Sequence, residues 1–216
     1  MKQLITLLIL WIPILLQAQP NVTQMKKSEL AKDLTYRGDF LNCTRWQDAL
    51  GENYLILSQS KIQKSAKALE GRDDFHKASR DKEIYACHYI MTADTTRLLW
   101  TLVDFQRDCP LDMTVEFLTE KPLITDLDNN GTAETWMVYQ LGCRGDVSPL
   151  TMKLIMHQGQ NKYAIRGTRK IKVSTNPDKI AGGEMTKEPS FNTLTPAINA
   201  YATELWTRYN FENLPR

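Results

Sequence analysis

Most of the chain alternates short runs rich in β-branched and aromatic residues with polar or glycine-bearing turns. Between residues 35 and 169 few apolar positions recur at helical spacing, so the pattern predicts mainly antiparallel β structure. The expected strands cover residues 40–46, 54–57, 84–91, 97–103, 113–118, 135–141, 151–157 and 163–166. Alternation is imperfect in 84–91, as expected for a strand covered on both faces. We therefore expect one sandwich-like, mainly β domain.

Three segments depart from this pattern. Residues 58–82 are polar and lysine-rich, which predicts a long exposed loop or a frayed helix. Residues 172–193 predict an irregular connection. Near the C-terminus, Thr195 and Pro196 have the character of a helix N-cap and first turn. Apolar residues then recur at helical spacing, which predicts an amphipathic helix over about 195–210: Ile198, Tyr201, Ala202, Leu205, Trp206 and Tyr209.

The N-terminus has the layout of a cleavable export signal. Lys2 precedes an apolar stretch over residues 4–16, and the small residue Ala18 follows it. The stretch is shorter than the roughly 20 residues of a membrane-spanning helix, and it contains Pro13. We expect residues 1–18 to be removed, which leaves a secreted domain over 19–216 in the periplasm or on the cell surface, without a transmembrane span.

The charge of the chain is nearly balanced, with 27 basic and 25 acidic residues. Loss of Lys2 with the signal segment changes the formal net charge from +2 to about +1. A nucleic-acid-binding domain would carry a clustered basic excess, so this class of partner is not expected. The length fits a single domain, and we expect a monomer.

Four cysteines, an even number in an exported chain, predict two disulfides. Of the three possible pairings we favour Cys109 with Cys143 and Cys43 with Cys87, because each joins neighbours in sequence. A zinc site is the alternative interpretation, but the chain has no CxxC pair and no histidine at ligand spacing.

Residues 126–134 carry the strongest chemical signal in the chain. Oxygen-bearing side chains stand at alternate positions, Gly131 stands sixth and an acid stands ninth. Calcium takes six to eight oxygen ligands, and one short loop can supply several of them only if it turns sharply, as glycine allows. The expected ligands are the side chains of Asp126, Asp128, Asn130 and Glu134, with the main-chain carbonyl of Thr132.

This loop is not an EF-hand, because its twelfth position is Met137 and β-type residues flank it. It resembles the shorter calcium loops that connect two strands in integrin-type propeller blades. A metal-free hairpin with Asx-type hydrogen bonds would suit the same turn. We favour calcium because three carboxylates this close would repel one another without a cation.

A second charged cluster comprises Asp108 and Asp112 beside Cys109, and Arg144 and Asp146 after Cys143. The favoured disulfide would hold these two turns together, so that the acids could pair with Arg144 or add a ligand to the calcium loop. Solvent-exposed charge on two tied loops is the alternative.

No arrangement typical of nucleophilic or phosphoryl-transfer catalysis is present, so no catalytic residue is assigned. Paired carboxylates could still hydrolyse a glycoside, and Glu116 is available beside Asp108, Asp112 and Asp146.

Several segments together resemble a family of exported Bacteroidetes proteins described as surface polysaccharide biosynthesis proteins. Residues 124–134 and the Cys-Arg-Gly-Asp-Val-Ser-Pro stretch at 143–149 are the most distinctive. Residues 109–112, 152–156 and 162–167, with Trp46, Gly51-Glu52-Asn53 and His88-Tyr89, fit it as well. The resemblance implies a process in the cell envelope and no particular reaction.

Together these features predict an exported, non-catalytic, calcium-binding accessory protein of cell-surface polysaccharide metabolism. Its expected partners are a glycan or an envelope protein. Two alternatives stay open, namely a carbohydrate-active hydrolase and an adhesion or protein-interaction module.

Overall fold

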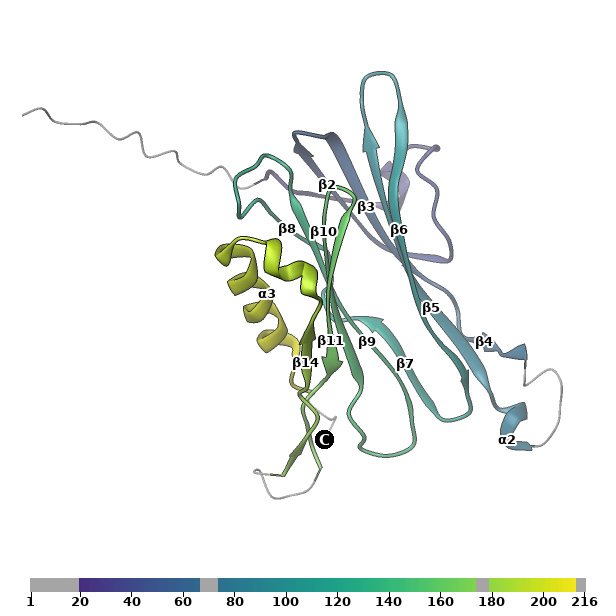
Figure 1. The fold of residues 1–216 in the computed structure, drawn as a ribbon. Helices are drawn as coiled ribbons and strands as arrows, with labels where there is room; N and C mark the ends of the chain where they lie inside the picture. Colours follow the sequence, from purple (N-terminus) through teal and green to yellow (C-terminus); the bar gives the residue numbers. More distant parts are fainter. Residues whose placement is uncertain (1–19, 67–73, 174–178, 213–216) are drawn as a thin grey trace, which may run out of the picture.

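The computed structural model describes residues 20–66, 74–173 and 179–212, which form a sandwich of two antiparallel sheets (Figure 1). The first sheet contains β1 (Thr23–Met25), β2 (Asp39–Asp48), β3 (Gly51–Gln59), β4 (Gln63–Lys64), β5 (Arg80–Met91) and β6 (Thr96–Cys109). The second contains β7 (Asp112–Phe117), β8 (Leu123–Thr125), β9 (Glu134–Arg144), β10 (Thr151–Gln158), β11 (Asn161–Thr168) and β14 (Met185–Lys187). The predicted mainly β, antiparallel, single-domain fold is confirmed.

The remaining elements are short, except for the C-terminal helix. They are η1 (Lys27–Glu29), α2 (Asp74–Lys77), the ribbon of β12 (Ile171–Lys172) and β13 (Ile180–Ala181), η2 (Pro189–Thr193) and α3 (Pro196–Tyr209). The predicted start of the helix is confirmed, since the Thr195 hydroxyl accepts a hydrogen bond from Ile198 N at 3.4 Å.

Three apolar clusters hold the layers together. The central cluster fills the space between the sheets and includes Trp46, Ile84 and Tyr139. A second cluster joins the other face of the second sheet to α3, which lies against that sheet in Figure 1. A third covers the outer face of the first sheet with the segment around Leu34. Because both sheets are covered on both faces, central strands such as β5 and β9 read as nearly continuous apolar runs.

Every predicted strand is present, but the strand bounds differ where side chains are polar. The expected loop over 58–82 is partly wrong, because β3 extends to Gln59, β4 is a strand, and β5 begins at Arg80. Likewise β6 continues to Cys109 through a charged segment. Ladder hydrogen bonds join main-chain groups, so a strand can continue where its side chains carry no apolar signal.

The disulfide between Cys109 and Cys143 is confirmed. The predicted pairing of Cys43 with Cys87 is wrong, because both thiols are free and buried. Cys43 on β2 and Cys87 on β5 both pair with Ile56 of β3, which lies between them. Two strand spacings of about 4.8 Å therefore separate the two cysteines. A disulfide needs Cα atoms within about 7 Å. Burial raises the pKa of the Cys43 thiol to about 12 and also raises that of Cys87.

The predicted signal segment, residues 1–18, lies outside the described residues. Among the helices that the structure describes, none is long and apolar enough to cross a membrane.

Candidate metal centre

The loop over residues 126–134 connects β8 to β9 as a hairpin. Thr125 stands opposite Glu134 in the ladder, so the two ends of the loop are held together by strand pairing. Within the loop, Asn129 and Gly131 have positive φ angles of 56° and 79°. Asparagine and glycine tolerate this left-handed conformation best, which explains why the sharp turn falls at this point.

The loop brings three carboxylates together. Asp126, Asp128 and Glu134 each offer an oxygen within 4.8 Å of the others, and this acidic cluster could hold a metal ion. The cluster lies partly inside the protein, since the side chain of Glu134 is completely buried. Buried like charges repel strongly unless a cation or proton compensates them.

Oxygen atoms of three predicted ligands converge on one point, which the amide of Gln158 marks. Its Nε2 atom lies 3.0 Å from Asp128 Oδ2, 3.3 Å from Glu134 Oε1 and 3.4 Å from the carbonyl oxygen of Thr132. Gln158 belongs to β10 and stands opposite Glu134 in the ladder. The partial positive charge of an N–H group thus lies where these acceptors meet.

The carboxylate of Glu134 is held in place by neighbouring donors. Thr125 Oγ1 donates to its Oε2 at 2.7 Å, and Leu127 N donates to the same oxygen at 3.0 Å. Burial raises the pKa of Glu134, these two hydrogen bonds lower it, and the charges of Asp128 and Asp126 raise it further. The net effect is an upward shift, which favours the protonated form in the absence of a cation.

Asp126 has one oxygen in the turn and one without a partner. Its Oδ2 accepts a hydrogen bond from Gly131 N at 3.1 Å, whereas its buried Oδ1 has no hydrogen-bond partner among the described residues. An orphaned buried acceptor in a native fold calls for a water molecule or an ion.

Asn130, the remaining predicted ligand, lies in the same loop but is engaged in the turn. Its Oδ1 accepts from Thr132 N at 2.8 Å, and its Nδ2 donates to Asp128 Oδ2 at 2.9 Å. The structure therefore gathers the three carboxylates and the Thr132 carbonyl, while the oxygen of Asn130 supports the loop.

Contacts with the first sheet were not foreseen from the sequence. Asp48, at the end of β2, accepts a hydrogen bond from Ala133 N at 3.1 Å, and Ala49 N donates to the carbonyl of Gly131 at 2.7 Å. Asp48 lies 85 positions away from its partner, so no local spacing could reveal it. Gln158 could have been found only from the register of β9 and β10.

The second predicted cluster does not join the metal centre. Arg144 forms its ion pair with Glu212 and also donates to the carbonyl of Ser148, instead of pairing with the acids of its own cluster. Asp146 is exposed and accepts from Ser148 N at 2.9 Å. Asp112 stands opposite Arg144 in the ladder, and Asp108 N donates to Asp81. In the part of the chain that the structure describes, none of these acids belongs to the metal-holding group.

Of the acids considered for glycoside hydrolysis, Glu116 lies in a hollow. This hollow of about 310 Å³ is also lined by Glu120. Glu116 accepts a hydrogen bond from Gln140 Nε2 at 2.6 Å, so one of its oxygens is already engaged. Asp108, Asp112 and Asp146 do not line this hollow.

Comparison with known proteins leaves the site to be interpreted from its own residues. No protein-family model, no curated protein and no solved structure matches the chain.

Proposed function

We propose that the loop over residues 126–134 binds one calcium ion, and that the chain is an exported, non-catalytic accessory protein of cell-surface polysaccharide metabolism. The observation that carries the metal assignment is the convergence of acceptors at a partly buried site, where β8 and β10 end and β9 begins. Two carboxylates and a main-chain carbonyl lie within 3.4 Å of Gln158 Nε2, and the unpartnered oxygen of Asp126 belongs to the same acidic group.

The chemistry of the donors favours calcium. All the candidate ligands are oxygen atoms, which suits a hard cation and gives soft metals no thiolate or imidazole. Magnesium demands a tight octahedral shell and keeps several waters, whereas calcium accepts the irregular shell that a hairpin provides. On binding, the amide of Gln158 would rotate so that its oxygen, instead of its N–H group, faces the ion.

Two observations support the accessory role in the envelope. A disulfide between Cys109 and Cys143 suits an oxidising compartment outside the cytoplasm. The sequence resemblance to exported surface polysaccharide proteins is the reason for proposing a role in cell-surface polysaccharide metabolism. The metal would act structurally, because its loop is hydrogen-bonded to the β2–β3 hairpin through Asp48 and Ala49 and thereby joins the two sheets.

A thermal melt in calcium and in chelator tests the metal assignment. Extracellular calcium modules bind with dissociation constants of about 10⁻⁴ to 10⁻³ M, and a tenfold excess of calcium then stabilises by about 1.4 kcal/mol. For a domain of this size, the midpoint should rise by about 3–6 °C. Magnesium should raise it less. Asp128→Asn should abolish the rise, because it removes one ligand charge while keeping an oxygen for Asn130 N.

Asp146→Asn is the matched control. Like Asp128, Asp146 lies in a loop and accepts a hydrogen bond from the main-chain N–H group two residues later in the chain. Unlike Asp128, it lies outside the acidic cluster. This variant should respond to calcium as the wild type does. A wild-type midpoint that does not move with calcium, or equal responses in both variants, would contradict the proposal.

A further inference from the structure

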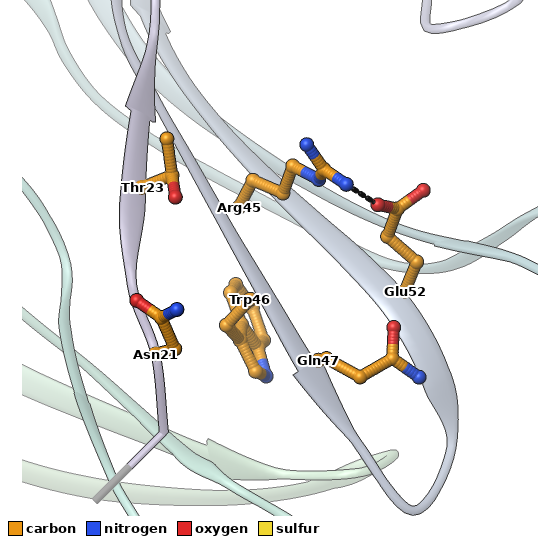
Figure 2. Close-up of a pocket in the computed structure, with 6 residues that line it drawn as sticks. All are labelled: Asn21, Thr23, Arg45, Trp46, Gln47 and Glu52. Atoms are coloured by element: carbon orange, nitrogen blue, oxygen red, sulfur yellow. Dashed lines mark ion pairs between the residues drawn. The ribbon is translucent and has the colours of Figure 1, made fainter.

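A polar hollow lies at the edge of the first sheet, where β1 runs along β2. It has a volume of about 280 Å³. Figure 2 shows Asn21 and Thr23 on the β1 side, facing residues of β2 and β3 across the hollow. The other lining residues are Arg45, Trp46, Gln47 and Glu52. The indole of Trp46 is almost completely buried in the central cluster, on the opposite face of β2 from Arg45 and Gln47, so the side chains that a ligand would meet in the hollow are polar.

The charged wall of the hollow is fixed in position. Arg45 and Glu52 form an ion pair between neighbouring strands (Figure 2). Tyr54 donates to Glu52 Oε2 at 2.9 Å, which restrains the carboxylate further. Among the described residues, the Arg45 guanidinium has Glu52 as its ion-pair partner, so most of its five N–H donors can face a ligand. Since the two charges are opposite and paired, the hollow carries no net charge and offers no reason to prefer an anion or a cation.

The other wall residues supply both donors and acceptors. In the described part of the chain, no protein group hydrogen-bonds the side chains of Asn21, Thr23 and Gln47. Two amides and a hydroxyl can each donate and accept. A ligand that matches this wall must itself donate and accept at closely spaced positions, as adjacent hydroxyl groups do.

A second hollow continues the first. It has a volume of about 490 Å³ and shares Gln47 and Glu52 with the first hollow. Gly51 and the end of β5 line the rest, through Met91, Thr92 and Ala93. Two adjoining hollows with common walls suit a chain of linked units better than one compact molecule.

We propose that the two hollows form one groove that binds a neutral oligosaccharide, with Arg45, Gln47 and Glu52 recognising its hydroxyl groups. This inference rests on the polysaccharide part of the proposed function and names the surface that would contact the glycan. It does not depend on the metal, although the turn at Gly51 belongs to the hairpin that the calcium loop contacts.

An NMR titration of the ¹⁵N-labelled chain starting at Gln19 tests the groove. The probes are the neutral disaccharides maltose, cellobiose, lactose and N,N′-diacetylchitobiose, each added in calcium and again in chelator. At least one should cause saturable shifts of the amides of Thr23, Gln47, Gly51 and Thr92, with millimolar affinity. Glu52→Gln should weaken binding by about tenfold or more, because it removes a charged hydrogen-bond acceptor, and Gln47→Ala should weaken it by about two- to tenfold, because it removes a neutral one.

Arg166→Gln provides the matched control. It breaks a similarly exposed ion pair, with Glu188, on the second sheet and away from the groove, so binding should not change. Gln47 is exposed, so Gln47→Ala tests recognition in a variant whose folding is not at risk.

Three results would contradict the proposal that this groove binds an oligosaccharide. They are the absence of saturable shifts with every disaccharide, shifts confined to another surface, and equal weakening in Arg166→Gln. Binding at another surface would contradict this groove and leave a glycan-binding function intact. The calcium melts contain no sugar, so the metal proposal is tested independently of these outcomes.

Discussion

Glu134 is the residue through which the proposed metal centre should respond to pH. Its pKa is raised by burial and by the neighbouring acids, so the metal-free native protein binds a proton more tightly there than the unfolded chain does. A carboxyl with a raised native pKa adds stability as the pH falls, because the native state then takes up the proton. Calcium requires the same carboxylate to be deprotonated.

The calcium-induced rise in melting midpoint should therefore shrink as the pH falls toward the raised pKa of Glu134. In chelator, protonation of Glu134 stabilises the native protein and raises its midpoint. In calcium, the proton competes with the ion and weakens its stabilising effect. The difference between the two midpoints therefore becomes smaller. Melts in calcium and in chelator at pH 7.5 and at pH 5 measure the effect. A gap that stays constant or widens at the lower pH would show that Glu134 is not a ligand.

Among the elements, the β2–β3 hairpin is linked to the loop over residues 126–134 by the carboxylate of Asp48 and by a main-chain hydrogen bond from Ala49 to Gly131. Asp48 accepts hydrogen bonds from Trp46 Nε1, Leu50 N, Asn53 Nδ2 and Ala133 N at 2.8–3.1 Å. Two of these donors belong to completely or almost completely buried residues, Trp46 and Asn53. The carboxylate thus satisfies groups from the hairpin and from the second sheet at once.

Asp48→Ala should lower the free energy of unfolding by about 3 kcal/mol or more. Each buried donor left without an acceptor costs about 1–3 kcal/mol. Asp146→Ala, which removes an exposed carboxylate bonded to Ser148 N, should cost much less. Urea unfolding of both variants in chelator provides the comparison. Similar losses in the two variants would rule out Asp48 as the link.

The sequence predicted the long strands and the C-terminal helix because their apolar periodicity is strong. It missed short elements such as β4 and β8, which pair with a neighbour through main-chain groups over two or three residues. It paired Cys43 with Cys87 because spacing along the chain does not reveal the intervening strand β3. The acidic cluster was predictable because its members share one short loop, whereas Asp48 and Gln158 reach it only through the tertiary fold.

In the whole molecule, two buried histidines face each other across the sandwich. Trp100 lies between them, stacked on His157 with ring centroids 3.8 Å apart and edge-on to His88 at 5.2 Å. His88 Nε2 lies 2.9 Å from Asn53 Oδ1, and Trp46 packs on its other side. Burial lowers the pKa of each histidine to about 3, with Lys162 adding to the shift of His157.

These histidines should make the fold sensitive to acid. The unfolded chain binds their protons near pH 6.5 and the native state only near pH 3, so stability falls as the pH drops through that window. Each contributes at most about 1.4 kcal/mol per pH unit. His157→Phe keeps the stack on Trp100 and removes one titrating group, so its unfolding free energy should fall less steeply between pH 6 and pH 4. Equal slopes in urea unfolding would contradict this account.

Isothermal titration calorimetry with calcium measures metal binding to the loop over residues 126–134 itself. The chain starting at Gln19, first freed of metal, should bind one calcium ion with a dissociation constant of about 10⁻⁴ to 10⁻³ M. Asp128→Asn should show no saturable heat, and Asp146→Asn should bind as the wild type does. An absence of saturable binding in the wild type, or equal binding in Asp128→Asn, would show that the loop over residues 126–134 is a metal-free hairpin.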